Sequence, residues 1–291
     1  MSSSFKNILI PVDFSANTEV AVKQATELAC TNGSTIHLLH VIKPQMIWSI
    51  IPVSNQFMFP LNENYSAKKA MNKLQQWKDA IEESFSYCKV KTYVAEGIVC
   101  GKIQDAAKEI KPQLIVIAKN RDHKYFSLFN SICANGLAKS TGYPVLTIRG
   151  RIIDTKIKII VVPVGSFIPN RKIELVIEFA KRYRAAIHLV TIPNKISIEE
   201  KNGNSFLETY RILKTVLSSP IEHHILKGSN LPKAILEYAE CIRADLMLVN
   251  PGTETKISNL SGKHINDALA TSSKLKVLSI EPYHDSEVSV C

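Results

Sequence analysis

The chain has 291 residues, of which 45% are hydrophobic and 21% charged, a composition that argues against a disordered or fibrous protein. Its length predicts two domains. The formal net charge of +10 is spread along the chain, with 17 basic and 11 acidic side chains in residues 1–150 and 19 and 15 in residues 151–291. Because the basic clusters are short, the charge indicates a solvated surface, and we expect no nucleic-acid partner.

No export signal or membrane span is predicted from the sequence. Residues 1–6 contain no charged stretch followed by a long apolar run, and the apolar run 157–164 is interrupted by Lys158 and Pro163. The six cysteines are scattered and form no CxxC pair. We therefore interpret them as reduced thiols, mostly in the core, and predict a cytoplasmic protein.

In the first half, short β-branched runs alternate with longer segments of helical period, which is typical of βαβ units with a parallel sheet. The apolar run 114–118 suits a strand covered by helices on both faces. Ala21, Ala25, Leu28 and Ala29 form one buried stripe of the first helix. We expect strands at 6–12, 35–41, 89–95, 113–118 and 144–148, and helices at 17–31, 66–86, 102–110 and 131–141.

The second half repeats the same alternation of strands and helices. The junction is predicted at about 150–155, which gives one domain at 1–150 and another at 151–291. We expect strands at 157–164, 185–191, 221–227, 244–249 and 275–280, and helices at 170–183, 198–218, 231–242 and 262–273.

An internal repeat supports this division. Two early landmarks recur at offsets of 152 and 151 residues, whereas two later ones recur at 132. The first copy therefore contains an insertion of about twenty residues, which we place at 43–66. The matched pairs are 8–13 with 160–165, 36–39 with 187–190, 113–116 with 245–248, and 144–148 with 276–280.

The segments Ile8–Ser15, Ile36–Val41 and Tyr143–Ile148 together resemble a universal stress protein domain. The resemblance covers nearly the whole chain in two copies and is stronger in the first. It implies an adenine nucleotide alpha hydrolase-like α/β fold. Each copy is expected to form a five-stranded parallel sheet in the order 3-2-1-4-5, and a pseudo-twofold axis is expected to relate the two copies.

The resemblance also implies where ATP-binding members hold their ligand. They use an Asp after the first strand and a loop G-x2-G-x9-G-[S/T] after the fourth, whose N–H groups surround the phosphates. Asp13 fills the first position, but Gly165 stands there in the second copy. Neither copy keeps a loop glycine, and the side chain of Arg121 would occupy the space that the family reserves for the phosphates. We therefore expect the standard ATP site to be lost in both copies. The loop positions are Ala118, Arg121, Ser131 and Ile132, and in the second copy Asn250, Thr253, Lys263 and His264.

Another kind of phosphate site is possible in the loop 118–132. Its basic cluster either holds a phosphate through charge or is a solvated loop. Asp13 either contacts a nucleotide or accepts hydrogen bonds from nearby backbone N–H groups, and the two roles can coexist. The cluster consists of Lys119, Arg121, His123 and Lys124. The candidate residues for binding ATP or AMP are Asp13, Lys119, Arg121 and Ser131; no other cofactor is expected.

Several histidines fall in predicted strands, but we predict no metal site. His223 and His224 face opposite sides of their strand and cannot bind one ion together; we also see no Cys or carboxylate at a ligand spacing beside them. Ser15 and Ser166 follow first strands without a nucleophile elbow or an adjacent base, so no catalytic residue is assigned. The histidines in question are His37, His40, His188, His223 and His224.

The insertion 43–66 is unusually apolar for a loop. It either contacts a protein partner or the other domain, or folds back over its own domain. We predict a non-catalytic stress-response protein that acts through ligand or protein binding. The alternative is an ATP- or AMP-binding regulatory switch that uses Asp13 and the loop 118–132. An enzyme acting on nucleotides is a third class.

The last prediction concerns the fifth strand of each copy. Segments 145–148 and 277–280 are apolar and lie at sheet edges, and an exposed apolar edge invites pairing. In the family that the chain resembles, this strand commonly mediates dimerisation. We therefore expect the two segments to pair antiparallel within the chain, with Val145 and Val277 buried near the seam.

Overall fold

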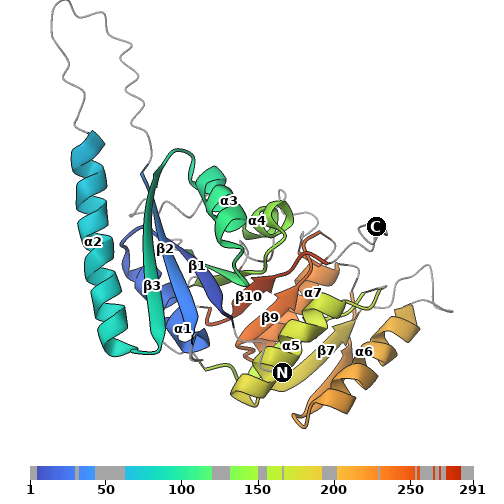
Figure 1. Ribbon diagram of the computed structural model, residues 1–291. Coiled ribbons are helices and arrows are strands. Elements are labelled where there is room, and N and C mark those ends of the chain that lie inside the picture. Colours follow the sequence, from blue (N-terminus) through green and yellow to red (C-terminus); the bar gives the residue numbers. More distant parts are fainter. Residues whose placement is uncertain are drawn as a thin grey trace, which may run out of the picture.

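The computed structural model describes residues 5–29, 33–42, 63–119, 132–149, 156–165, 167–191, 202–228, 230–252, 254–255, 265, 269 and 273–282. These residues form one sheet with helices on both faces (Figure 1). The first half contains β1 (Asn7–Val12), α1 (Ala16–Leu28), β2 (Ser34–Ile42), α2 (Glu63–Ser84), β3 (Cys88–Glu96), α3 (Val99–Ile110), β4 (Leu114–Lys119), α4 (Ala134–Thr141) and β5 (Val145–Arg149). The second half contains β6 (Ile159–Pro163), α5 (Asn170–Tyr183), β7 (Ala186–Thr191), α6 (Asn202–Val216), β8 (Ile221–Ile225), α7 (Leu231–Cys241), β9 (Leu246–Val249) and β10 (Lys276–Ser279).

The ten strands lie in the order β3-β2-β1-β4-β5-β10-β9-β6-β7-β8. Strands β1 to β5 are mutually parallel and follow the predicted order 3-2-1-4-5. Strands β6 to β10 follow the same order when they are counted within their own half. Most of the predicted helix at 262–273, most of the insertion 43–66 and the whole junction 150–155 lie outside the described residues.

The two sets of strands meet at β5 and β10, which pair antiparallel, with Leu146 opposite Leu278. Val145 and Val277 are fully buried beside this seam, so the predicted pairing is confirmed. Because the strands of each half are parallel but the seam is antiparallel, the carboxyl ends of the two sets lie at opposite ends of the sheet.

The two faces of the sheet are covered differently. On one face, α1, α2, α5 and α6 pack into one continuous core that includes both halves. Phe5 and Phe179 meet in this core, with ring centroids 5.7 Å apart. On the other face, α3 and α4 cover the first half and α7 covers the second, in two separate clusters. The halves are therefore joined through the seam and through one shared helical layer.

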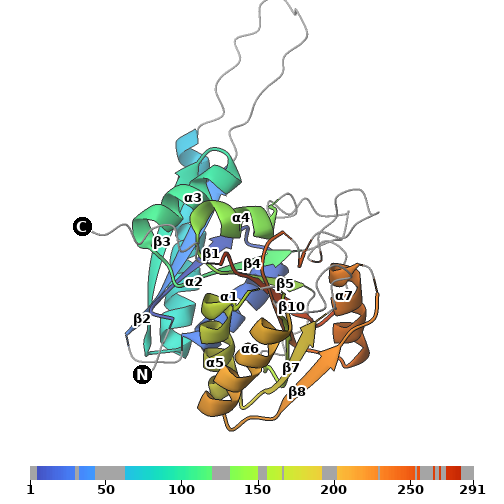
Figure 2. The same cartoon turned by 90° about the vertical axis from the view of Figure 1, so that its right-hand side faces the viewer.

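Helices α1 and α5 lie side by side in this layer (Figure 2). Arg182 of α5 donates through Nη1 to the carbonyl oxygens of Glu27 and Leu28, at 3.0 and 2.6 Å. Both carbonyls belong to the last turn of α1, where backbone acceptors have no partner within the helix and a cation is favourable. A side chain from the second half therefore caps a helix of the first.

Replacing Arg182 with alanine is expected to lower the free energy of unfolding by about 1.5–3 kcal/mol, the usual range for charge-assisted hydrogen bonds. Lys181 precedes it on the same helix and is exposed, so Lys181→Ala is the control and should change stability by less than about 0.5 kcal/mol. Urea unfolding followed by circular dichroism measures both. Equal effects of the two variants would contradict the capping role.

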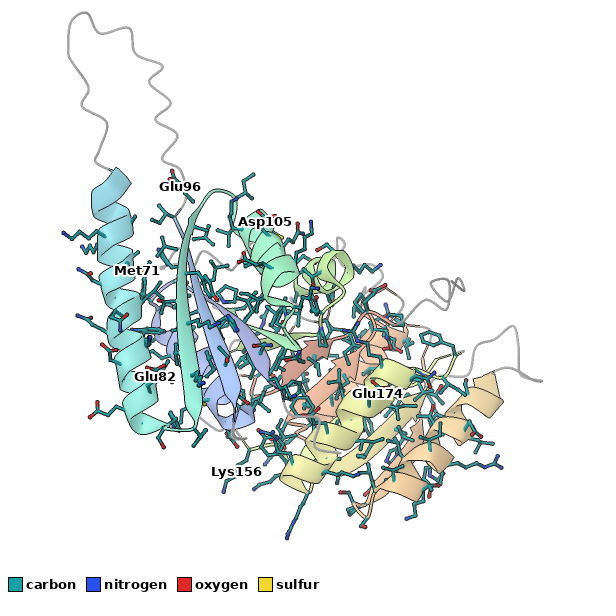
Figure 3. All side chains as sticks on the ribbon, in the orientation of Figure 1. Met71, Glu82, Glu96, Asp105, Lys156 and Glu174 are labelled. Atoms are coloured by element: carbon teal, nitrogen blue, oxygen red, sulfur yellow. The ribbon has the colours of Figure 1, made fainter. Side chains whose placement is uncertain are left out.

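Charged side chains such as Asp105 and Lys156 lie at the periphery, whereas apolar side chains fill the space between helices and sheet (Figure 3). Among the described residues, no helix combines the length and the apolar character needed to cross a membrane.

Candidate functional site

Asp13 follows β1 directly, at the carboxyl end of the strand. Its Oδ1 accepts hydrogen bonds from the backbone N–H of Ser15 at 3.1 Å and from the hydroxyls of Ser15 and Thr18, both at 2.5 Å. These contacts organise the turn that leads into α1. The backbone-binding role considered for Asp13 is therefore present, and the carboxylate lies where open α/β sheets bind their ligands.

Phe14 adopts a left-handed backbone conformation, with φ of 58°. Such a conformation is unusual for a large side chain and persists only when the surroundings enforce it. Its ring packs against His40, at 4.6 Å between centroids, and edge-on against Trp77, at 5.7 Å. The Lys73 ammonium lies 5.2 Å from the same ring. This cluster fixes the turn that carries Asp13 against β2 and α2.

Lys119 was expected in a loop, but the structure places it inside β4, where its side chain is buried. The strand ends one residue later than predicted because Lys119 lies in register with Arg149 of the neighbouring β5. Arg149 donates through Nη1 to the carbonyl of Leu269, which belongs to the second half. Arg121 and Ser131 lie outside the described residues. Of the four predicted site residues, Asp13 and Lys119 are thus placed, at the carboxyl ends of adjacent strands.

The corresponding end of the second half contains a buried ion pair. Lys172 of α5 is fully buried, and its Nζ lies 2.7 and 3.0 Å from the two carboxylate oxygens of Glu254. The same Nζ donates to the carbonyl of Pro163, the last residue of β6, at 2.8 Å. Three acceptors thus satisfy the three N–H donors of the ammonium. Burial lowers the pKa of Lys172, and the charge of Glu254 opposes this shift.

Glu254 also binds the loop that follows β9. Its Oε2 accepts from the backbone N–H of Asn250 at 2.7 Å. The Asn250 side chain donates to the carbonyl of Ile280 at 3.0 Å. The Glu254 carboxylate therefore accepts the hydrogen bond of the Asn250 backbone N–H, and Lys172 neutralises its charge.

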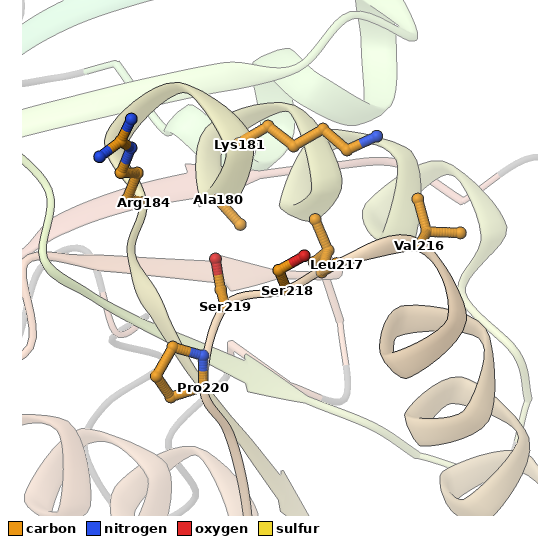
Figure 4. A pocket seen from close by; sticks show the side chains of 8 residues that line it. All are labelled: Ala180, Lys181, Arg184, Val216, Leu217, Ser218, Ser219 and Pro220. Atoms are coloured by element: carbon orange, nitrogen blue, oxygen red, sulfur yellow. The ribbon is translucent and has the colours of Figure 1, made fainter.

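A pocket of 370 Å³ lies at a different place in the second half (Figure 4). It opens between the last turns of α5 and α6 and the start of β8, with Lys181, Arg184 and Ser219 in its wall. This position is the amino end of the strands. Ligands of doubly wound sheets bind at the carboxyl ends instead, so we do not assign the pocket as the site.

The described strand histidines make local contacts. His37 Nδ1 lies 3.0 Å from the Tyr93 hydroxyl, and burial, with a smaller effect of Lys91, lowers the pKa of His37 to about 4. His40 Nδ1 lies 2.7 Å from the carbonyl of Val12. Burial also lowers the pKa of His40. Both imidazoles are therefore neutral, structural groups at physiological pH.

The prediction from the sequence that no carboxylate lies at a ligand spacing beside His223 and His224 is wrong. Glu222 precedes His224 by two residues in β8, so both point to the same face, and its Oε2 lies 3.2 Å from His224 Nε2. His188 on β7 pairs with Glu222 and lies 3.8 Å from the same oxygen. The prediction rested on the opposite faces of the adjacent residues His223 and His224, whereas the period of two along a strand places Glu222 on the same face as His224.

A doubly wound α/β sheet with the strand order 3-2-1-4-5 is the architecture of nucleotide-binding-type α/β proteins. The model of the universal stress protein family matches residues 4–149, about half of the chain. The chain belongs to the universal stress protein family.

Individual relatives agree with this assignment. Universal stress protein A homolog 1 of Coxiella burnetii is 24% identical over 133 residues, which are 44% of this chain and 85% of that protein. The crystal structure of a universal stress protein from Archaeoglobus fulgidus covers 97% of both chains, with a TM-score of 0.68 and 16% identity. A functionally unknown protein from Pseudomonas aeruginosa covers 96% of this chain and 93% of its own, with a TM-score of 0.58 and 16% identity. The two structures are similar in fold.

Proposed function

We propose that the chain is a tandem universal stress protein, with copies at 1–150 and 151–291, that acts through binding and not through catalysis. The repeated strand order supports two copies, since β6 to β10 follow the same order as β1 to β5. The fold likeness to the universal stress protein of Archaeoglobus fulgidus, over 97% of both chains, supports the same division.

The Lys172–Glu254 ion pair is the observation that carries the proposal. It fills the carboxyl end of β6 and β9 with side chains of the protein and uses the N–H of Asn250, a donor that a phosphate would need. Opening the site would separate two buried charges, which is costly. Ligand binding at the strand ends is therefore assigned to the first half alone.

The contacts of Ser15 support a role without catalysis. Its hydroxyl donates to Asp13 and lies 3.4 Å from the Thr18 hydroxyl. A serine nucleophile requires a base that accepts its proton and is itself oriented by a third group. In this turn the carboxylate instead accepts from Ser15 and Thr18 together, which is the arrangement of a helix start.

A nucleotide switch in the first half is the second candidate. Asp13 is only partly buried and stands at the carboxyl end of β1, beside the end of β4 where Lys119 lies. A carboxylate and a cation at neighbouring strand ends suit a ribose hydroxyl and a phosphate, respectively. ATP or AMP is the proposed ligand of this candidate. The insertion 43–66 as a surface for a protein partner, and a cytoplasmic location, stay predictions.

Calorimetric titration of the full chain with ATP and with AMP tests both candidates. The switch requires one nucleotide per chain, with affinity reduced about tenfold or more in Asp13→Ala and Asp13→Asn, because hydrogen bonds to a charged group are lost. Asp13→Asn keeps the shape of the turn and guards against simple unfolding. Glu19→Gln, an exposed carboxylate in the first turn of α1, is the matched control and should bind normally.

The possible results separate the candidates. Wild-type protein that binds neither nucleotide would exclude the switch and leave protein binding as the function. Two nucleotides per chain would contradict the closed site of the second half. Nucleotide turnover that Asp13→Asn abolishes would overturn the non-catalytic proposal.

A further inference from the structure

A polar cluster lies on the α7 face of the sheet, at the edge strand β8. It consists of His188 of β7 and Glu222 and His224 of β8, one ligand atom of each lying within 4.8 Å of the others. The two imidazole rings are nearly parallel, with centroids 5.5 Å apart and an interplanar angle of 9°. Strand register produces this grouping, because His188 lies opposite Glu222, and His224 is two residues further on the same face.

We propose that His188, Glu222 and His224 form a binding site for a divalent transition-metal ion, with Zn²⁺ as the expected occupant. Two imidazoles and one carboxylate are a ligand set found in zinc sites that keep a fourth position open. Imidazole ligands also suit Ni²⁺ and Cu²⁺.

Two of the three distances within the cluster are close to those of such a site. Zinc–ligand bonds of about 2.0–2.2 Å in a tetrahedral arrangement place neighbouring ligand atoms about 3.3–3.6 Å apart. Glu222 Oε2 lies 3.2 Å from His224 Nε2 and 3.8 Å from His188 Nδ1. The side chains of Glu222 and His224 are 58% and 37% exposed, so they are free to adjust around an ion that arrives from solvent.

The surroundings provide one fixed ligand and a supporting group. His188 is buried, and its Nδ1 lies 2.8 Å from the Tyr238 hydroxyl of α7. The Tyr238 ring also packs at 5.0 Å from that of His224. Tyr238 therefore holds the His188 ring in place before an ion binds, and because its hydroxyl uses the same Nδ1 that faces Glu222, this hydrogen bond is exchanged for the metal bond when the ion binds. His223 points to the other face, where it packs against Phe206 and Tyr210 of α6.

Zinc titration of the metal-free, full-length chain against a chromophoric chelator tests the proposal, with a reductant that keeps cysteines as thiols. We expect one Zn²⁺ per chain. Glu222→Gln and His224→Gln should each weaken the affinity for Zn²⁺ by at least about tenfold. Removing a group that only hydrogen-bonds to a metal ligand already weakens metal affinity by about tenfold or more, and these variants remove ligands themselves. Both residues lie on an exposed edge strand, and circular dichroism verifies that the variants are folded.

Two controls separate this site from adventitious binding. His223→Gln removes the neighbouring imidazole on the opposite face, and Cys241→Ser removes an exposed thiol one turn beyond Tyr238. Both should bind zinc like the wild type, and Zn²⁺ should raise the unfolding temperature of the controls but not of His224→Gln. Cobalt in place of zinc should give no thiolate charge-transfer absorption. A wild-type chain that takes up no zinc, or equal losses in His223→Gln and His224→Gln, would overturn the proposal.

Discussion

Replacing Lys172 with methionine is expected to lower the free energy of unfolding by about 3–5 kcal/mol, the cost of leaving a buried charge without its partner. Methionine fills a similar volume but removes the ammonium that lies 2.7 Å from the Glu254 carboxylate. Glu254 is itself buried, so water does not replace the lost contact. Chemical denaturation followed by fluorescence or circular dichroism measures the change.

Two further variants make this result specific. Because an apolar pair of similar volume often replaces a buried ion pair without loss, the double variant Lys172→Met with Glu254→Met should recover most of the stability. Lys102 and Asp105 form an exposed pair at 3.2 Å, so Lys102→Met should cost less than about 1 kcal/mol. If Lys172→Met were as mild as Lys102→Met, the ion pair would not hold the second-half site closed.

Val277→Lys is expected to loosen the two halves and to speed proteolysis between them. Val277 is fully buried beside the β5–β10 seam, and a lysine there would bury an ammonium in an apolar cluster. The cost is about 3–5 kcal/mol, and it falls on β5 and β10, the strand pair through which the described parts of the two halves are joined. Limited proteolysis with mass spectrometry measures the rate and the place of the first cleavage, which we expect within the junction 150–155.

Val216→Lys is the matched control, because Val216 ends α6 and is 43% exposed. It introduces the same charge without burial and should leave the cleavage rate near that of the wild type. Cleavage kinetics that are unchanged in Val277→Lys, or cleavage that begins inside either half, would contradict a seam that holds the halves together.

The strands and helices could be predicted from the sequence, because hydrophobic period is a local signal and the repeat divides the chain. The strand order 3-2-1-4-5 was predicted from the family resemblance. The antiparallel pairing of β5 with β10 could also be predicted, since two apolar edge strands in one chain can cover each other. Lys119 shows a limit of this reasoning. Lys119 was expected in the loop 118–132, but register with Arg149 places the end of β4 at Lys119.

The candidate site was less predictable, because its main contacts join residues far apart in the chain. Lys172 and Glu254 are separated by 82 positions, and nothing in the local pattern of either residue indicates the other. His188 and Glu222 come together only through the register of β7 and β8. Asp13 was predicted from the family resemblance, which places an Asp directly after the first strand, and its hydrogen-bond partners Ser15 and Thr18 lie within five residues of it.

The antiparallel seam has a consequence for communication within the molecule. Because of this seam, the carboxyl ends of the two sets of strands point in opposite directions, and four strands lie between β1 and β6. A small ligand held by Asp13 therefore does not reach the Lys172–Glu254 pair. Any signal between these places has to be mechanical. The direct route is α1, which begins at the Asp13 turn and ends on the guanidinium of Arg182. A shift of this helix along its axis would be transmitted to α5, whose first turn carries Lys172.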